Sequence, residues 1–128
     1  MKNLILILLS VVFFACNKLP ANGSGNNNSN NTEKIKAKVV RITCASTTIE
    51  ILDASHYDLG VSWTMEGTAN TYEHVAVVAN KCEFPSNLKE GDTFYFQVIN
   101  ESDASNDCAV CMMYDFPPSK SIFLKVVN

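Results

Sequence analysis

The chain has 128 residues, 47% of them hydrophobic, with ten basic side chains against thirteen acidic ones. This length suits one small domain, and the negative balance disfavours nucleic acid or an anionic membrane surface as an electrostatic partner. No G-x-S-x-G elbow or other arrangement that fixes a catalytic triad is present, so we do not expect an enzyme.

The amino-terminal residues have the pattern of a secretory signal. Lys2 precedes the apolar run LILILLSVVFFA at 4–15, which is shorter than the about twenty residues of a membrane-spanning helix. The run ends with the small residue Ala15 directly before Cys16. This junction resembles a bacterial lipobox, which implies a signal peptide at 1–15 and a lipid anchor, with palmitate among its acyl chains, on Cys16. A signal peptide cut after Ala15 that leaves Cys16 free is the alternative.

The segment after Cys16 has the composition of a tether. Residues 17–32 read NKLPANGSGNNNSNNT and are dominated by Asn, Gly and Ser. Such a segment buries too little apolar surface to offset its ordering entropy, so we expect 16–32 to be a disordered, lipidated linker. A coil of this length reaches about 20–25 Å, which holds the domain at 33–128 clear of the lipid headgroups.

Strand signals dominate residues 33–128 and helix signals are nearly absent. Ile35, Ala37 and Val39 alternate with polar residues, and the phase then changes at Val40, which predicts a bulge in one long strand. Similar patterns of β-branched and alternating residues predict strands at 35–42, 47–53, 59–65, 72–79, 93–99, 108–114 and 121–127. These short strands indicate an all-β sandwich or barrel.

The bent first strand and the LKEGDTFYFQV stretch at 88–98 resemble a small antiparallel Greek-key barrel of the OB type. A small immunoglobulin-like sandwich is the alternative. The whole chain resembles small envelope lipoproteins of Bacteroidota-type, Gram-negative bacteria, a resemblance that brings no activity with it. Surface-exported proteins of that kind carry acidic residues after the lipidated cysteine, and residues 17–20 lack them, so we expect the anchored domain to face the periplasm.

The remaining cysteines are Cys44, Cys82, Cys108 and Cys111. An even number in an oxidising compartment predicts two disulfides. If 107–114 is a strand, the Cα atoms of Cys108 and Cys111 are about 10 Å apart, too far for a mutual bond. Each then pairs with Cys44 or Cys82, the arrangement we favour. A turn at 107–111 permits the local Cys108–Cys111 bridge instead.

Two functions of different classes remain open. The first is a non-enzymatic binding or structural module that presents a β surface to a protein, glycan or small-molecule ligand and needs no cofactor. The second is a periplasmic thiol-redox or metal-handling protein built on Cys108 and Cys111. Redox CxxC motifs lie at helix N-termini, which this sequence does not predict, so we favour the first.

One stretch gathers the residue types that suit a binding surface, namely His56, Tyr57, Trp63, Tyr72 and His74. If 59–65 and 72–79 form a hairpin, we expect Trp63, Tyr72 and His74 to share one surface. Aromatic side chains with polar tips are enriched in interfaces, which makes this face the candidate site. The alternative is that Trp63 fills the core and His74 is merely exposed.

Overall fold

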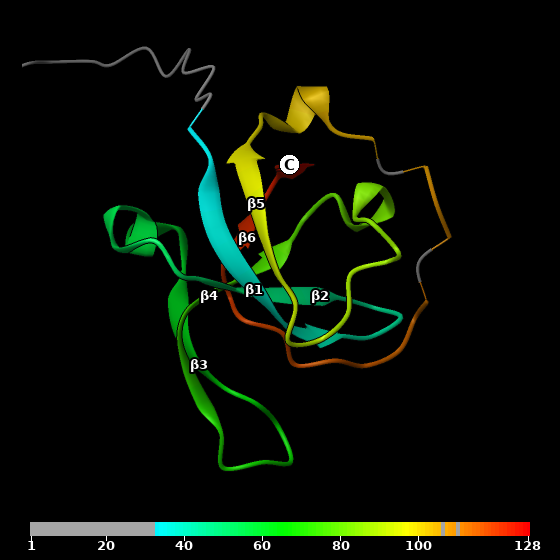
Figure 1. Ribbon diagram of the computed structural model, residues 1–128. Coiled ribbons are helices and arrows are strands. Elements are labelled where there is room, and N and C mark those ends of the chain that lie inside the picture. The colour runs from blue at the N-terminus through cyan, green and yellow to red at the C-terminus, as the bar shows by residue number, and fades with distance from the viewer. Residues whose placement is uncertain (1–32, 106, 110) are drawn as a thin grey trace, which may run out of the picture.

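The computed structural model describes residues 33–105, 107–109 and 111–128 (Figure 1). The expected signal peptide, the lipidation site Cys16 and the tether lie outside the described residues. The described chain contains the strands β1 (Ile35–Ile42), β2 (Thr47–Ile51), β3 (Val61–Thr64), β4 (Thr71–Val78), β5 (Thr93–Val98), β6 (Ser121–Ile122) and β7 (Leu124–Val127). Three short 3-10 helices connect them, namely η1 (Ala54–Leu59), η2 (Lys81–Glu83) and η3 (Glu101–Asp103). The all-β class is confirmed, and no helix of these described ranges is long and apolar enough to cross a membrane.

The strands hydrogen-bond in the order β3-β4-β2-β1-β5-β7, and all pairings along this path are antiparallel. β6 pairs in parallel with the end of β4, where Val77 and Val78 face Ser121 and Ile122. Only Phe123 separates β6 from β7, so residues 121–127 pair first with β4 and then with β5. The hairpin of β3 and β4 projects from the rest of the sheet (Figure 1).

β1 has the bulge that its sequence predicts. The register between β1 and β2 shifts between Val39 and Arg41, so Val40 is the extra residue. Both Val39 and Val40 are buried, which explains why the apolar alternation changes phase there. Lys36 and Lys38 of β1 lie on its outer face, where Lys38 pairs with Glu50 at 2.8 Å.

The core lies between the inner faces of the strands and consists of apolar residues, namely Ile35, Ala37, Val39, Ile49, Ile51, Ala76, Val78, Phe94, Phe96, Ile122 and Leu124. Asn80 is buried beside it and binds the backbone of Leu124 on both sides. Its Nδ2 donates to the Leu124 carbonyl at 2.7 Å, and its Oδ1 accepts from the Leu124 amide at 2.9 Å. The side-chain amide therefore stands where a neighbouring strand would offer a peptide group.

The strand expected at 108–114 is wrong, because the described residues between η3 and β6 form no strand. Cys108 is bonded to Cys82 of η2, and Cys111 to Cys44 in the turn between β1 and β2. Neither partner offers a free strand edge, so the segment has no ladder to join. The strand expected at 59–65 is shorter, since Leu59 ends η1.

Candidate functional site

Two disulfides fix the long connection between β5 and β6. Cys44 bonds Cys111 and Cys82 bonds Cys108, with Cα–Cα distances of 5.6 and 5.5 Å. The favoured crossed pairing is therefore confirmed, although the strand geometry from which we inferred it is absent. The two cysteines of the CxxC motif bond to different elements and not to each other.

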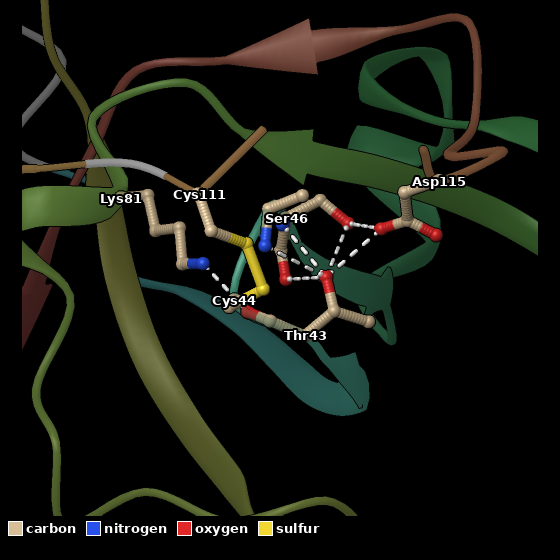
Figure 2. Close-up of a disulfide and its surroundings, with 7 residues drawn as sticks. Thr43, Cys44, Ser46, Lys81, Cys111 and Asp115 are labelled. Atoms are coloured by element: carbon tan, nitrogen blue, oxygen red, sulfur yellow. Dashed lines mark hydrogen bonds between the residues drawn. A yellow bond between two sulfur atoms is a disulfide. The ribbon is translucent and has the colours of Figure 1, made fainter. Parts of the chain in front are cut away.

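A buried carboxylate, Asp115, holds the same connection four residues further on (Figure 2). Its Oδ2 accepts a hydrogen bond from Thr43 Oγ1 at 2.9 Å and a second one from Ser46 Oγ. Its Oδ1 lies 3.0 Å from Arg41 Nη1 in an ion-pair contact, and the Asp115 side chain is only 4% exposed. Thr43 and Ser46 belong to the turn that also contains Cys44. The Cys44–Cys111 disulfide and the Asp115 carboxylate therefore bind the same turn.

The charge of Asp115 is stabilised in this position. Burial raises the pKa of Asp115, but the hydrogen bonds from Ser46 and Thr43 and the charge of Arg41 outweigh burial and hold that pKa below its ordinary 3.8. Burial lowers the pKa of Lys81, an effect that the nearby Asp115 opposes. Lys81 Nζ donates to the Thr43 carbonyl at 2.6 Å, so this cation also faces the turn.

Residues 111–116, which we call the anchored loop, expose large apolar side chains between these two attachments. Met112 is 99% exposed, Tyr114 82%, Met113 50% and Phe116 43%. Burial of such side chains is normally favourable by about 1.5–3 kcal/mol each. Their exposure on a backbone held at Cys111 and Asp115 is the feature of the described residues that most suggests a binding site.

The anchored loop also contacts the β3–β4 hairpin. Trp63 Nε1 donates a 3.0 Å hydrogen bond to the Phe116 carbonyl. The Trp63 and Tyr72 rings lie 6.2 Å apart, and Tyr114 packs edge-on against Phe116 at 4.6 Å. Trp63 and Tyr72 are half-buried, and the hydrogen bond connects them to Tyr114 and Phe116 of the exposed loop. We call these four residues the aromatic row.

The sequence-predicted surface divides into pairs. Trp63 and Tyr72 join the aromatic row, whereas Tyr57 stacks on His74 with ring centroids 3.6 Å apart. His56 turns toward the amino-terminal end of the domain, with Nε2 3.4 Å from Glu33 Oε2. That these five residues bind a partner stays a prediction.

A backbone irregularity positions His74. The register between β3 and β4 shifts between Val61 and Trp63, and His74 has a φ of 55°, a value that few non-glycine residues adopt. Gly60 lies directly against this bulge, where a Cβ would be 2.1 Å from the His74 carbonyl carbon. Gly60, which follows η1, can approach β4 this closely because glycine has no side chain.

Sequence reasoning missed the apolar side chains of the anchored loop as a surface. The signal was present as a Met-Met-Tyr-x-Phe run between Cys111 and Pro117-Pro118, but we expected a strand there. Within the described ranges, no group of three His, Cys, Asp or Glu side chains is placed to hold a metal ion.

Two shallow hollows of about 330 and 350 Å³ lie beside β5 and β7 and share Pro85 and Val126 in their walls. Glu83, Asp103 and Lys125 give the second hollow a polar rim. Neither includes a residue of the anchored loop, and neither gathers the convergent polar groups of a small-molecule site. We therefore place the candidate site on the loop and the aromatic row.

Comparison of the chain with protein-family models, with curated proteins and with solved structures gives no match.

Proposed function

We propose that the chain is a lipid-anchored, non-enzymatic envelope protein that binds a macromolecular partner through the anchored loop. One observation carries the proposal: Met112, Met113 and Tyr114 are exposed, while their backbone is held by a disulfide at one end and a buried carboxylate at the other. A preorganised loop loses little conformational entropy on binding, so its apolar contacts convert efficiently into affinity. Exposed Tyr and Met are also residue types that interfaces favour.

The envelope address rests on the sequence pattern at 1–32, with Cys16 as the lipidated residue and the periplasm as the favoured side. The position of the loop suits this address. The expected tether ends at residue 32, shortly before Ile35. The turn that is bonded to the loop follows Ile42 at the other end of β1. A strand of eight residues spans about 26 Å, so the start of β1 and the turn that the loop contacts lie at opposite ends of this strand. A tethered domain thus presents the loop away from its own anchor.

For the architecture we propose an OB-type barrel in preference to an immunoglobulin-like sandwich. The support comes from residues 121–127, which pair with β4 on one side and with β5 on the other. The Val77 and Ala79 amides donate to the Lys120 and Ile122 carbonyls, each at 2.8 Å. Slow hydrogen exchange of these two amides would support closure of the sheet, and exchange at the rate of the loops would contradict it.

Site-specific photo-crosslinking tests the binding function. A benzoylphenylalanine in place of Tyr114 should form a discrete adduct in intact cells, because Tyr114 is 82% exposed on the loop. The same group in place of Tyr95, which is 45% exposed on β5, is the matched control. Adducts of equal yield at both positions, or none at Tyr114, would refute the proposal, and turnover of insulin reduction by the chain would favour the redox alternative.

A further inference from the structure

The surroundings of the anchored loop are acidic. Residues 90–119 contain six acidic side chains and no Lys, Arg or His. Asp107 precedes Cys108 and is exposed, and Glu83 is exposed next to Cys82, the disulfide partner of Cys108. Glu90 is exposed as well, and its Oε1 accepts from the Ile42 amide at 2.8 Å, two residues before Cys44. Disulfides and a hydrogen bond therefore connect three exposed acidic residues to the elements that hold the loop.

The cations near the loop do not offset this charge on the outside. Arg41 is paired with the buried Asp115, and the ammonium groups of Lys81 and Lys120 donate hydrogen bonds to the carbonyls of Thr43 and Asp58. Lys89 adjoins Glu90, but Asp92 of the same turn balances it. Met112 and Tyr114 are thus exposed on a segment whose attached elements carry exposed acidic residues, and we call Glu83, Glu90 and Asp107 its acidic rim.

We infer that the partner is a protein segment with an apolar face bordered by Lys and Arg, such as a basic amphipathic helix. This inference rests on the proposed function and adds the chemistry of the occupant. Opposite charges at a rim steer association and fix orientation, while apolar anchors at the centre supply affinity. Methionine side chains adapt to the shape of such a helix.

The same charges argue against two other occupants. A second copy of the chain would bring Glu83, Glu90 and Asp107 against an identical acidic rim, and like charges across an interface are unfavourable. A bilayer with anionic lipids is likewise repelled, and the loop faces away from the proposed anchor. A basic protein surface is the occupant that the exposed charges favour.

The test uses the full chain in phosphatidylcholine nanodiscs and three synthetic helix-forming peptides as probes. The first contains leucine and lysine, the second leucine and glutamate in the same pattern, and the third serine and lysine. We expect the leucine–lysine peptide to bind at least about tenfold more tightly than either of the others, with an affinity that falls as salt rises. Binding is measured by fluorescence anisotropy of labelled peptide, with empty nanodiscs as the blank.

Variants separate the contribution of the apolar loop from that of the acidic residues. Met112→Ser with Tyr114→Ser should reduce the affinity for the leucine–lysine peptide about tenfold, whereas the exposed control Tyr95→Ser should not. Glu83→Gln, Glu90→Gln and Asp107→Asn together should reduce affinity and flatten the salt dependence. A control that removes two acidic charges elsewhere, at Asp58 of η1 and Glu66 of the hairpin turn, should leave the affinity and its salt dependence unchanged.

Equal binding of the lysine and glutamate peptides, lost in the Met112→Ser/Tyr114→Ser variant, would overturn the basic partner and leave the binding loop standing. Binding that this variant does not weaken would overturn the loop as well. Self-association in sedimentation runs, or uptake by phosphatidylcholine vesicles, that depends on Met112 and Tyr114 would assign the loop to another occupant and refute the inference.

Discussion

Trp63 and Phe116 lie 53 positions apart, and the indole Nε1 of Trp63 donates a 3.0 Å hydrogen bond to the carbonyl oxygen of Phe116. The acceptor is a backbone atom, so this bond fixes the path of the anchored loop and not merely one side chain. Trp63 is the only tryptophan of the chain. Its fluorescence should therefore report whether the loop is in place.

Trp63→Phe removes the indole donor and keeps an aromatic ring beside Tyr72. We expect the free energy of unfolding to fall by about 1 kcal/mol, the usual net value of one hydrogen bond, in urea denaturation followed by circular dichroism. Tyr72→Phe, which removes a hydroxyl from the other ring of the pair, is the control and should change stability little. A loss for Trp63→Phe no larger than that of the control would contradict the role assigned to this bond.

Removal of the disulfides should have unequal costs. The bonds Cys44–Cys111 and Cys82–Cys108 close loops with sequence separations of 67 and 26. In the chain-entropy model they contribute about 4.4 and about 3.5 kcal/mol to the free energy of unfolding. The Cys44→Ser/Cys111→Ser variant should thus melt at the lower temperature in calorimetry and should shift the emission of Trp63. A larger cost for the Cys82–Cys108 pair would show that loop length does not set the order.

The strands were largely predictable because one face of the sheet is buried. Alternation marked β1 by Ile35, Ala37 and Val39, and the same period marked β5 by Phe94 and Phe96. Burial of one face imposes a period of two on the sequence, so pattern alone locates such strands. The two adjacent buried valines at 39 and 40 even revealed the bulge.

The anchored loop was not predictable because its conformation depends on residues far away in the chain. Asp115 binds Thr43 and Ser46 across 72 and 69 positions, and Cys111 bonds Cys44 across 67. Local pattern at 108–114 favoured a strand, but such distant contacts leave no periodic signal. The pairing of the cysteines was predicted from a strand that does not exist, so that agreement does not validate its premise.

Gly60→Ala should be strongly destabilising. An alanine Cβ would lie 2.1 Å from the His74 carbonyl carbon, and backbone on that side cannot move without disturbing the β3–β4 register. We expect a loss of at least about 3 kcal/mol by urea denaturation, at the upper end for overpacking. Gly67→Ala is the control, since nothing lies near its Cβ and only its φ of 75° is unfavourable. The control should cost about 1 kcal/mol, and an equal loss for both variants would exclude the close approach as the cause.

Asn80→Asp should cost more than Asn80→Ala. The Asn80 Nδ2 donates to the Leu124 carbonyl and to Glu83 Oε2, and an aspartate would place a charged acceptor against both. Alanine leaves the Leu124 groups unpaired, at about 1–3 kcal/mol for each buried group, but adds no buried charge. Thermal denaturation near neutral pH should rank wild type above Asn80→Ala and Asn80→Ala above Asn80→Asp. The reverse order of the two variants would mean that the amide protons of Asn80 matter less than its volume.

Asp115→Asn should change the response of the domain to acid. The pKa of Asp115 is held below 3.8 in the folded chain, so the unfolded chain takes up the proton first as the pH falls. The stability that the carboxylate contributes is therefore complete above the unfolded pKa and is lost as the pH falls through the folded pKa. At neutral pH the variant should be less stable by about 2–3 kcal/mol, because Arg41 loses its counter-ion and Ser46 and Thr43 lose a charged acceptor.

The deciding measurement is the difference in unfolding free energy between wild type and Asp115→Asn across the acid range. This difference should be constant down to about one unit above the ordinary pKa of 3.8 and should shrink below it. The pKa of Asp53 is also lowered, by its hydrogen bonds with Ser55, but both proteins retain Asp53, so its contribution cancels. A difference that stays constant or grows on acidification would mean that the contacts between Asp115 and the turn after β1 do not depend on the charge of Asp115.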